Sequence, residues 1–190
     1  MFDANIPLPF RLCSLALDLH PDDPNLPTLI PALFHSGRVS LHTLHLGIYH
    51  QSIVPLLYAP IQSVGPQLRT LRLESRHDAL QDHLDLFATF SRLESLELRP
   101  TNPFTNPSDS LLAILDALPS PPTLLNLSLS LMNPSHLKPF IPILKHPALA
   151  RLTTLELSML SGSMTQDKPI ARAMAEVRKD RRIRVLVGGK

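Results

Sequence analysis

The residues that could do chemistry in this sequence are its nine histidines, its single cysteine and a group of alternating charges. His42 and His45 are three residues apart in an extended segment, so they point to opposite faces of a strand and cannot share a metal ion. His77 and His83 are six apart on an expected helix, and no HxxxH or HExxH pattern occurs. There is no glycine-rich phosphate loop and no GxSxG motif. Cys13 heads a strand and is interpreted as a small core or rim residue. We therefore expect no catalytic residue, no cofactor and no metal.

Charged side chains alternate with leucines near the middle of the chain. Arg72 and Glu74 in one segment occupy the same positions as Glu97 and Arg99 in the next. If the two segments are neighbouring parallel strands, Arg72 lies beside Glu97 and Glu74 lies beside Arg99. Such cross-strand ion pairs hold the register and contribute roughly 0.2–1 kcal/mol each. The same array can be a charged hot spot for a partner, because arginine binds carboxylates through paired donors. Both interpretations stay open.

These charges lie within or directly after a phrase of the form LxxLxL, which recurs along the chain. Its alternating end predicts a half-buried strand, and the interval to the next phrase is long enough for a helix. Spacings of 25 to 31 residues between first leucines indicate a repeat architecture. The first leucines are Leu12, Leu41, Leu68, Leu93, Leu124 and Leu152, and a weaker copy contains Ile183, Val185 and Val187.

The repeat predicts a single α/β domain over 1–190, a solenoid with a curved parallel sheet. Each crossover of some 20 residues makes the next strand parallel and the connection right-handed. Strands lie ~4.8 Å apart while helices need ~8–10 Å, so the strands take the concave side. Expected strands are 12–18, 41–47, 68–74, 93–99, 124–130 and 152–158. Expected helices are 26–35, 52–58, 78–90 and 108–118, with a kinked or partly 3₁₀ segment at 135–146, where Pro139 and Pro142 interrupt a regular helix.

This pattern resembles the leucine-rich repeat, in the long class similar to ribonuclease inhibitor, over residues 12–187. The family usually places Asn or Cys three positions after the last leucine, and this chain departs from that pattern. It has His20, Tyr49, Arg76, Thr101, Met132 and Leu160 there. Irregular, proline-rich repeats also resemble the repeat region of F-box/leucine-rich-repeat proteins, particularly fungal ones. That resemblance implies substrate recognition for a ubiquitin ligase, although the chain has no room for an F-box before its first repeat.

The side chains before, between and after the last two leucines of each phrase form three columns on the concave face. The first contains Ser14, Thr43, Thr70, Ser95, Asn126 and Thr154, and the second contains Ala16, His45, Arg72, Glu97, Ser128 and Glu156. The third contains Asp18, Gly47, Glu74, Arg99, Ser130 and Ser158. The hydroxyl-rich first column is interpreted mainly as a solvated ladder of strand residues. The sequence predicts a non-catalytic module that binds a protein partner by complementarity. The candidate protein-binding residues are His45, Arg72, Glu74, Glu97, Arg99, Asn126 and Glu156.

Positive charge gathers at the C-terminus, where residues 168–190 hold eight Lys or Arg and two Asp or Glu. Ile170, Ala173, Met174 and Val177 fall on one helix face, which favours a cap helix and strand over 168–187 that closes the last repeat. The alternative is a scaffold that binds nucleic acid or acidic membrane here. Nucleic acid is disfavoured because the chain has no Trp and few rings for stacking. The basic patch would be Arg178, Lys179, Arg181, Arg182 and Arg184.

The remaining composition bounds the setting of the protein. The formal charge of +2 is too small to imply a nucleic-acid partner, and one cysteine permits no intramolecular disulfide. No secretory signal is apparent, and no apolar run approaches the ~20 residues of a membrane span. We expect a cytoplasmic or nuclear protein, either a monomer or part of a larger complex.

Overall fold

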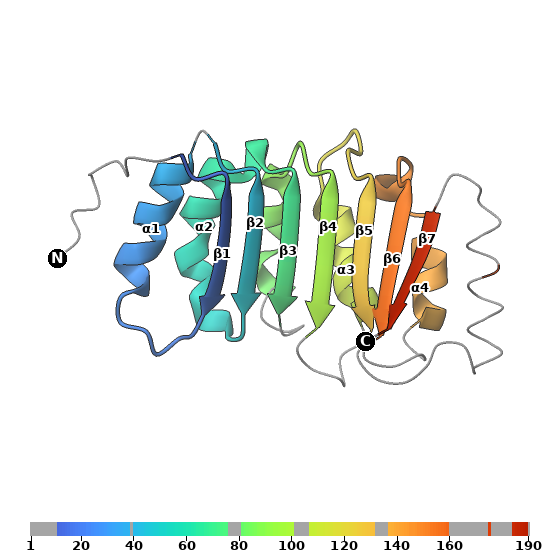
Figure 1. Cartoon of the computed structure of the whole chain (residues 1–190), viewed down its shortest axis with the longest axis horizontal. Coiled ribbons are helices and arrows are strands. Elements are labelled where there is room, and N and C mark those ends of the chain that lie inside the picture. The colour runs from blue at the N-terminus through green and yellow to red at the C-terminus, as the bar shows by residue number, and fades with distance from the viewer. Residues whose placement is uncertain are drawn as a thin grey trace.

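The computed structural model describes residues 11–38, 40–75, 81–100, 107–131, 137–159, 175 and 184–189. Seven strands form one sheet in chain order, and every neighbouring pair is parallel (Figure 1). The chain is therefore an α/β protein that adds each new strand to the same edge. The strands are β1 Ser14–Leu19, β2 Thr43–Ile48, β3 Thr70–Ser75, β4 Ser95–Pro100, β5 Asn126–Leu131, β6 Thr154–Met159 and β7 Arg184–Gly189.

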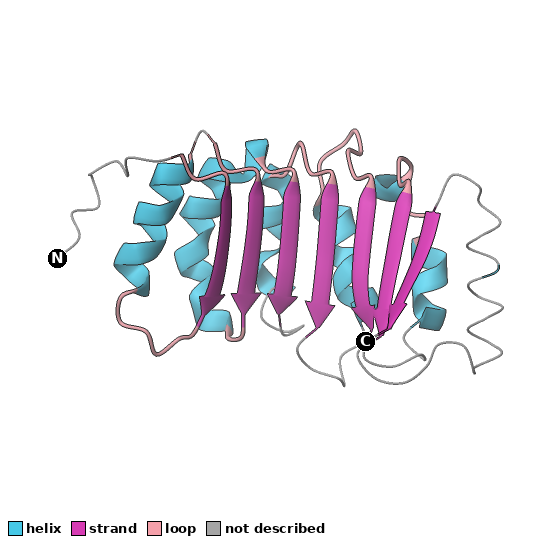
Figure 2. Ribbon diagram, viewed as in Figure 1, coloured by secondary structure: helices cyan, strands magenta, loops and turns pink. Residues whose placement is uncertain are grey.

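The described helices lie in the connections between strands and cover one face of the sheet (Figure 2). None of them lies over the opposite face, which we call the open face. The α-helices are α1 Leu26–Gly37, α2 Val54–Val64, α3 Pro107–Ala117 and α4 Leu137–Ile143. The 3₁₀ segments are η1 Gln51–Ile53, η2 Gly65–Gln67, η4 Gln81–Thr89 and η6 Pro147–Leu149. No helix of the described segments is long and apolar enough to cross a membrane.

The leucines of each phrase build the core between the sheet and the helices. Leu44, Leu71 and Leu96 occupy the same position in successive strands, and at most 1% of each is exposed. Burying one leucine side chain stabilises the fold by roughly 1.5–3 kcal/mol. The buried residues form one continuous cluster from Leu15 to Leu157. The repeated phrase thus supplies one layer of a shared core per strand.

Each of the first six strands begins two residues later than the sequence predicts and ends one residue later. The reason is a recurring hydrogen-bond arrangement just before the strand. The N–H groups of His42 and Thr43 both donate to the Cys13 carbonyl, at 3.0 and 3.2 Å. The same two-donor arrangement recurs between every neighbouring pair from β1 to β6. The first leucine of each phrase therefore precedes the strand, and it is buried in every phrase except the first, where Leu12 is half-buried.

The helical segments match the predictions in part. Helices predicted at 26–35 and 108–118 correspond to α1 and α3, while α2 runs six residues beyond the predicted 52–58. The helix predicted at 78–90 is instead the 3₁₀ segment η4, interrupted at His83, with 76–80 outside the described residues. Phe87 of this segment and the adjoining Phe90 are still buried.

The proline-rich region predicted to be irregular contains α4, which includes Pro142 and is followed by the 3₁₀ segment η6. At the C-terminus, β7 pairs with β6 in register, as the weak last phrase predicts. The predicted cap helix falls almost entirely outside the described residues, and so do Ile170, Ala173, Met174 and Val177.

Candidate functional site

The register of the sheet aligns the side chains between the leucines into the three predicted columns. Ala16, His45, Arg72 and Glu97 are register partners on successive strands, and the column continues through Ser128 and Glu156. Because side chains alternate along a strand, these residues lie opposite the buried leucines. The predicted alignment is confirmed along the first two columns. In the third column, the register between β4 and β5 ends at Leu98 and Leu129, one residue before Arg99 and Ser130, and two members, Gly47 and Ser130, are buried.

A charged cluster of Arg72, Glu97 and Arg99 occupies the centre of the open face. The Arg99 Nε–H donates to Glu97 Oε1 at 2.6 Å, and Arg72 Nε lies 3.6 Å from the same oxygen. The Arg99 side chain is 38% exposed, that of Arg72 is 31% exposed and that of Glu97 is 23% exposed. One carboxylate oxygen therefore faces two guanidinium groups in a partly desolvated setting, where a charged hydrogen bond is stronger than in bulk water.

The second predicted ion pair does not form as expected. Glu74 and Arg99 are register partners, but Arg99 pairs with Glu97 on its own strand. Residues two apart in a strand share a face, so this pairing competes with the cross-strand one. Glu74 instead contributes to the electrostatic environment of Tyr49. The charged cluster consequently holds two cations and one anion.

Tyr49 lies among carboxylates at one side of the face. Its hydroxyl donates to Asp18 Oδ1 at 3.3 Å, and its ring stacks on His20 with centroids 5.4 Å apart. Burial raises the pKa of Tyr49, and the negative charges of Glu74 and Asp18 raise it further. A Cβ at Gly47 would overlap Asp18 Oδ1, so the absent side chain makes room for this carboxylate. His20 and Tyr49, which each follow a strand, thus form a ring stack beside the Asp18 carboxylate.

His45 lies on β2 at the open face, where its register partners are Ala16 on β1 and Arg72 on β3. Its Nε2 atom is buried and has no hydrogen-bond partner among the described residues. Arg72 Nε is in the same condition, since 3.6 Å to Glu97 is an ion pair but too long for a hydrogen bond. Two neighbouring polar groups therefore keep unused hydrogen-bonding capacity.

The other half of the face is built from smaller side chains. Ser128 is the register partner of Glu97, and Ser130 is buried with its hydroxyl 3.0 Å from that of Ser158. Asn126 and Glu156 are exposed, and the described structure gives their side chains no contact with the charged cluster. Among the predicted protein-binding residues, Arg72, Glu97 and Arg99 therefore contact one another, whereas Asn126 and Glu156 lie apart from this cluster.

The basic patch can be placed only at one residue. Arg178, Lys179, Arg181 and Arg182 lie outside the described residues. Arg184 begins β7, is exposed, and donates its backbone N–H to the Thr153 carbonyl at 2.7 Å. The binding of nucleic acid or acidic membrane by this segment stays a prediction.

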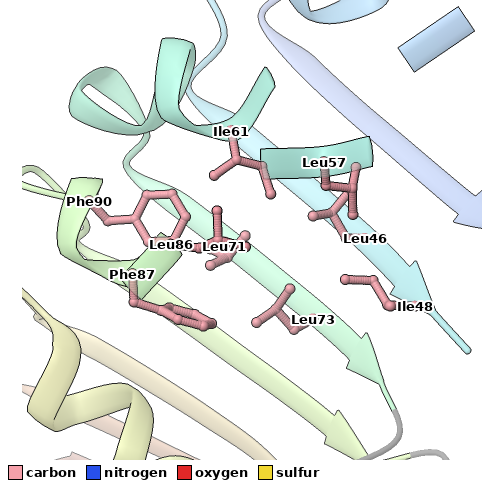
Figure 3. Close-up of a pocket in the computed structure, with 9 residues that line it drawn as sticks. All are labelled: Leu46, Ile48, Leu57, Ile61, Leu71, Leu73, Leu86, Phe87 and Phe90. Carbon is pink, nitrogen blue, oxygen red and sulfur yellow. The ribbon is translucent and has the colours of Figure 1, made fainter. Parts of the chain in front are cut away.

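A cavity of about 20 Å³ lies between the sheet and the helices (Figure 3). Its lining is entirely apolar and comes from β2, β3, α2, η4 and the adjoining Phe90, with Leu57, Leu71 and Phe87 among the side chains. An apolar space about the size of one water molecule stays dry and has no group to orient a substrate. Within the described segments, no three His, Cys, Asp or Glu residues gather as a metal site.

Comparisons with protein-family models, with curated proteins and with solved structures found no match for this chain.

Proposed function

We propose that this protein is a non-catalytic interaction module that binds a protein partner on the open face of its sheet. One observation carries this proposal. The open face has no described helix over it, and it aligns polar and charged side chains in register around the Arg72, Glu97 and Arg99 cluster. A rigid sheet that presents ordered charges recognises a partner by electrostatic complementarity.

We also propose that the architecture is a leucine-rich-repeat solenoid whose open face is concave. Support comes from repetition at three levels: the LxxLxL phrase, one parallel strand per phrase, and the carbonyl before each of β1 to β5 that accepts two N–H groups from the start of the next strand. In such an architecture each repeat contacts mainly its neighbours, so the strands form an extended surface rather than a closed pocket.

The finer proposal is substrate recognition for a ubiquitin ligase in the cytoplasm or nucleus. It rests on the resemblance to F-box/leucine-rich-repeat proteins, in which the repeats bind the substrate.

The absence of catalysis is part of the same proposal. The hydroxyls of Ser130 and Ser158 bond to each other, and in the described part of the face neither meets a general base.

Steric blocking of the open face tests the function. Asn126→Trp and Ser128→Trp each place a large ring on that face, whereas Leu112→Trp enlarges a side chain that is 41% exposed on α3. In affinity capture from cells, partners retained by the unmodified protein should be lost with Asn126→Trp or Ser128→Trp and kept with Leu112→Trp. Loss with Leu112→Trp alone would place the interface on the helices and refute the proposal.

A further inference from the structure

The charged cluster holds more hydrogen-bond donors than its single carboxylate satisfies. Each arginine carries five N–H donors. Among the described residues, the only hydrogen bond from either guanidinium is that from Arg99 Nε to Glu97 Oε1 at 2.6 Å. The terminal amino groups of Arg72 and Arg99 have no such bond, and the two side chains remain about a third exposed. Two partly free guanidinium groups thus lie together in the middle of the face.

The charge of this cluster is also unbalanced. Glu97 neutralises one guanidinium, and Glu74 forms no ion pair with either arginine in the described structure. Glu74 is the register partner of Arg99, and its charge also raises the pKa of Tyr49. Next to the cluster, His45 Nε2 and Arg72 Nε lack hydrogen-bond partners. Two guanidinium groups with unused hydrogen-bond donors therefore lie side by side, and only one of them makes a short contact with a carboxylate.

The two sides of the cluster have the opposite character. Asp18 lies on β1 and Glu156 on β6, both exposed, and neither forms an ion pair within the described structure. An acidic group on a partner is attracted to the centre of the face and repelled from both sides. This arrangement favours a partner that places one carboxylate opposite the centre of the face over a partner whose whole surface is acidic.

We propose that the partner is a protein segment that inserts one Asp or Glu side chain between Arg72 and Arg99, with residues other than Asp or Glu on either side of it. Arginine suits this task because its planar fork binds a carboxylate through two parallel hydrogen bonds. This inference rests on the proposed function and specifies the chemistry of its partner.

Selection from a displayed library of random nonapeptides tests the inference. The full chain is compared with Arg72→Gln/Arg99→Gln and with Arg69→Gln/Arg151→Gln, which removes the same charge outside the three columns. Arg69 and Arg151 are exposed, so their loss should not disturb the fold. We expect peptides selected by the unmodified and control proteins to contain one Asp or Glu at a fixed position. Peptides selected by the Arg72→Gln/Arg99→Gln protein should lack it.

The selected peptide then provides a test that does not depend on protein folding. Changing its acidic residue to Gln should weaken binding to the unmodified protein at least tenfold by fluorescence anisotropy, while changing a neighbouring residue to Ala should have less than a threefold effect. Equal binding of the Gln peptide, or selection of basic peptides, overturns the inference. Those results leave the proposed function standing if tryptophan at Asn126 or Ser128 still abolishes partner capture.

Discussion

Glu97 connects two arginines through one oxygen, but the two contacts differ in geometry. Arg99 makes a hydrogen bond at 2.6 Å, whereas Arg72 lies at 3.6 Å. Partly exposed pairs contribute up to ~1 kcal/mol, and weaker geometry contributes less. Double-mutant cycles measured by urea unfolding should therefore give Glu97–Arg99 a coupling of ~0.5–1 kcal/mol and Glu97–Arg72 a smaller one.

The ion pair between Arg69 and Glu94 serves as the matched control for these cycles. Its atoms are 3.5 Å apart, and the side chains are 57% and 44% exposed. Solvent screening should reduce its coupling toward zero. A coupling for Arg72–Glu97 larger than for Arg99–Glu97 would contradict the described geometry of the cluster.

Tyr49 should ionise at a higher pH than an ordinary tyrosine, because burial and the charges of Glu74 and Asp18 raise its pKa. In a Tyr58→Phe background only Tyr49 titrates, since the chain has two tyrosines. Tyrosinate absorbance should give a pKa above the usual value of about 10. The substitution Asp18→Asn should lower the pKa of Tyr49, whereas Asp22→Asn, at an exposed position, should leave that pKa unchanged.

The raised pKa of Tyr49 also has a consequence for stability. The folded protein keeps the phenol proton at a pH where the unfolded chain has lost it. The resulting stabilisation is fully present below the unfolded pKa of about 10 and is lost as pH rises through the folded pKa. If the free energy of unfolding did not fall over this alkaline range, the proposed environment of Tyr49 would be wrong.

Hydroxyl groups link successive repeats at the start of the strands. Thr123 Oγ1 donates to the Leu93 carbonyl at 2.7 Å in a part-buried position, and Thr153 Oγ1 donates to the Leu125 carbonyl at 3.0 Å in an exposed one. Thr123→Val should cost about 1 kcal/mol because it leaves a carbonyl less well satisfied. Thr153→Val should cost less because water replaces the hydroxyl. Denaturant unfolding of both variants checks the order, and the reverse order would refute it.

The strands were predictable because the phrase marks the same position in every repeat. Leu71 and Leu96 are register partners, and the charges between leucines align with them. The helical cover was less predictable. The interval from Leu68 to Leu93 is the shortest, at 25 residues. A 3₁₀ helix rises ~2.0 Å per residue against 1.5 Å for an α-helix, so η4 spans the sheet with fewer residues. The spacing of apolar residues alone does not show whether this segment forms a 3₁₀ helix or an α-helix.

The sequence predicts which residues of the site lie side by side on neighbouring strands, but not which charged side chains form ion pairs. The register places Arg72 beside Glu97 and Glu74 beside Arg99. Long charged side chains have many rotamers, and their choice decides which groups meet. Arg99 consequently pairs with Glu97 on its own strand rather than with Glu74. The ring stack of His20 on Tyr49 had no sequence signal beyond the departure from Asn at those positions.

At the scale of the whole molecule, the two faces of the sheet differ in composition and cover. The helices cover one face of the sheet only (Figure 2). Leucines fill the side toward the helices, and polar or charged side chains occupy the open face. In such a division the repeated spacing of the leucines determines the fold, while the residues between them are free to determine the partner. Exchanging side chains in the columns should therefore alter binding without altering the fold.

Site-specific photo-crosslinking tests the central claim most directly. A photoreactive amino acid is placed at Asn126 or Glu156 on the open face, and at Gln62 on α2 or Leu112 on α3 as controls; all four side chains are exposed. We predict that irradiation in cells joins a protein partner to Asn126 and Glu156 and not to Gln62 or Leu112. Crosslinks confined to Gln62 and Leu112 would contradict the assignment of the open face as the binding surface.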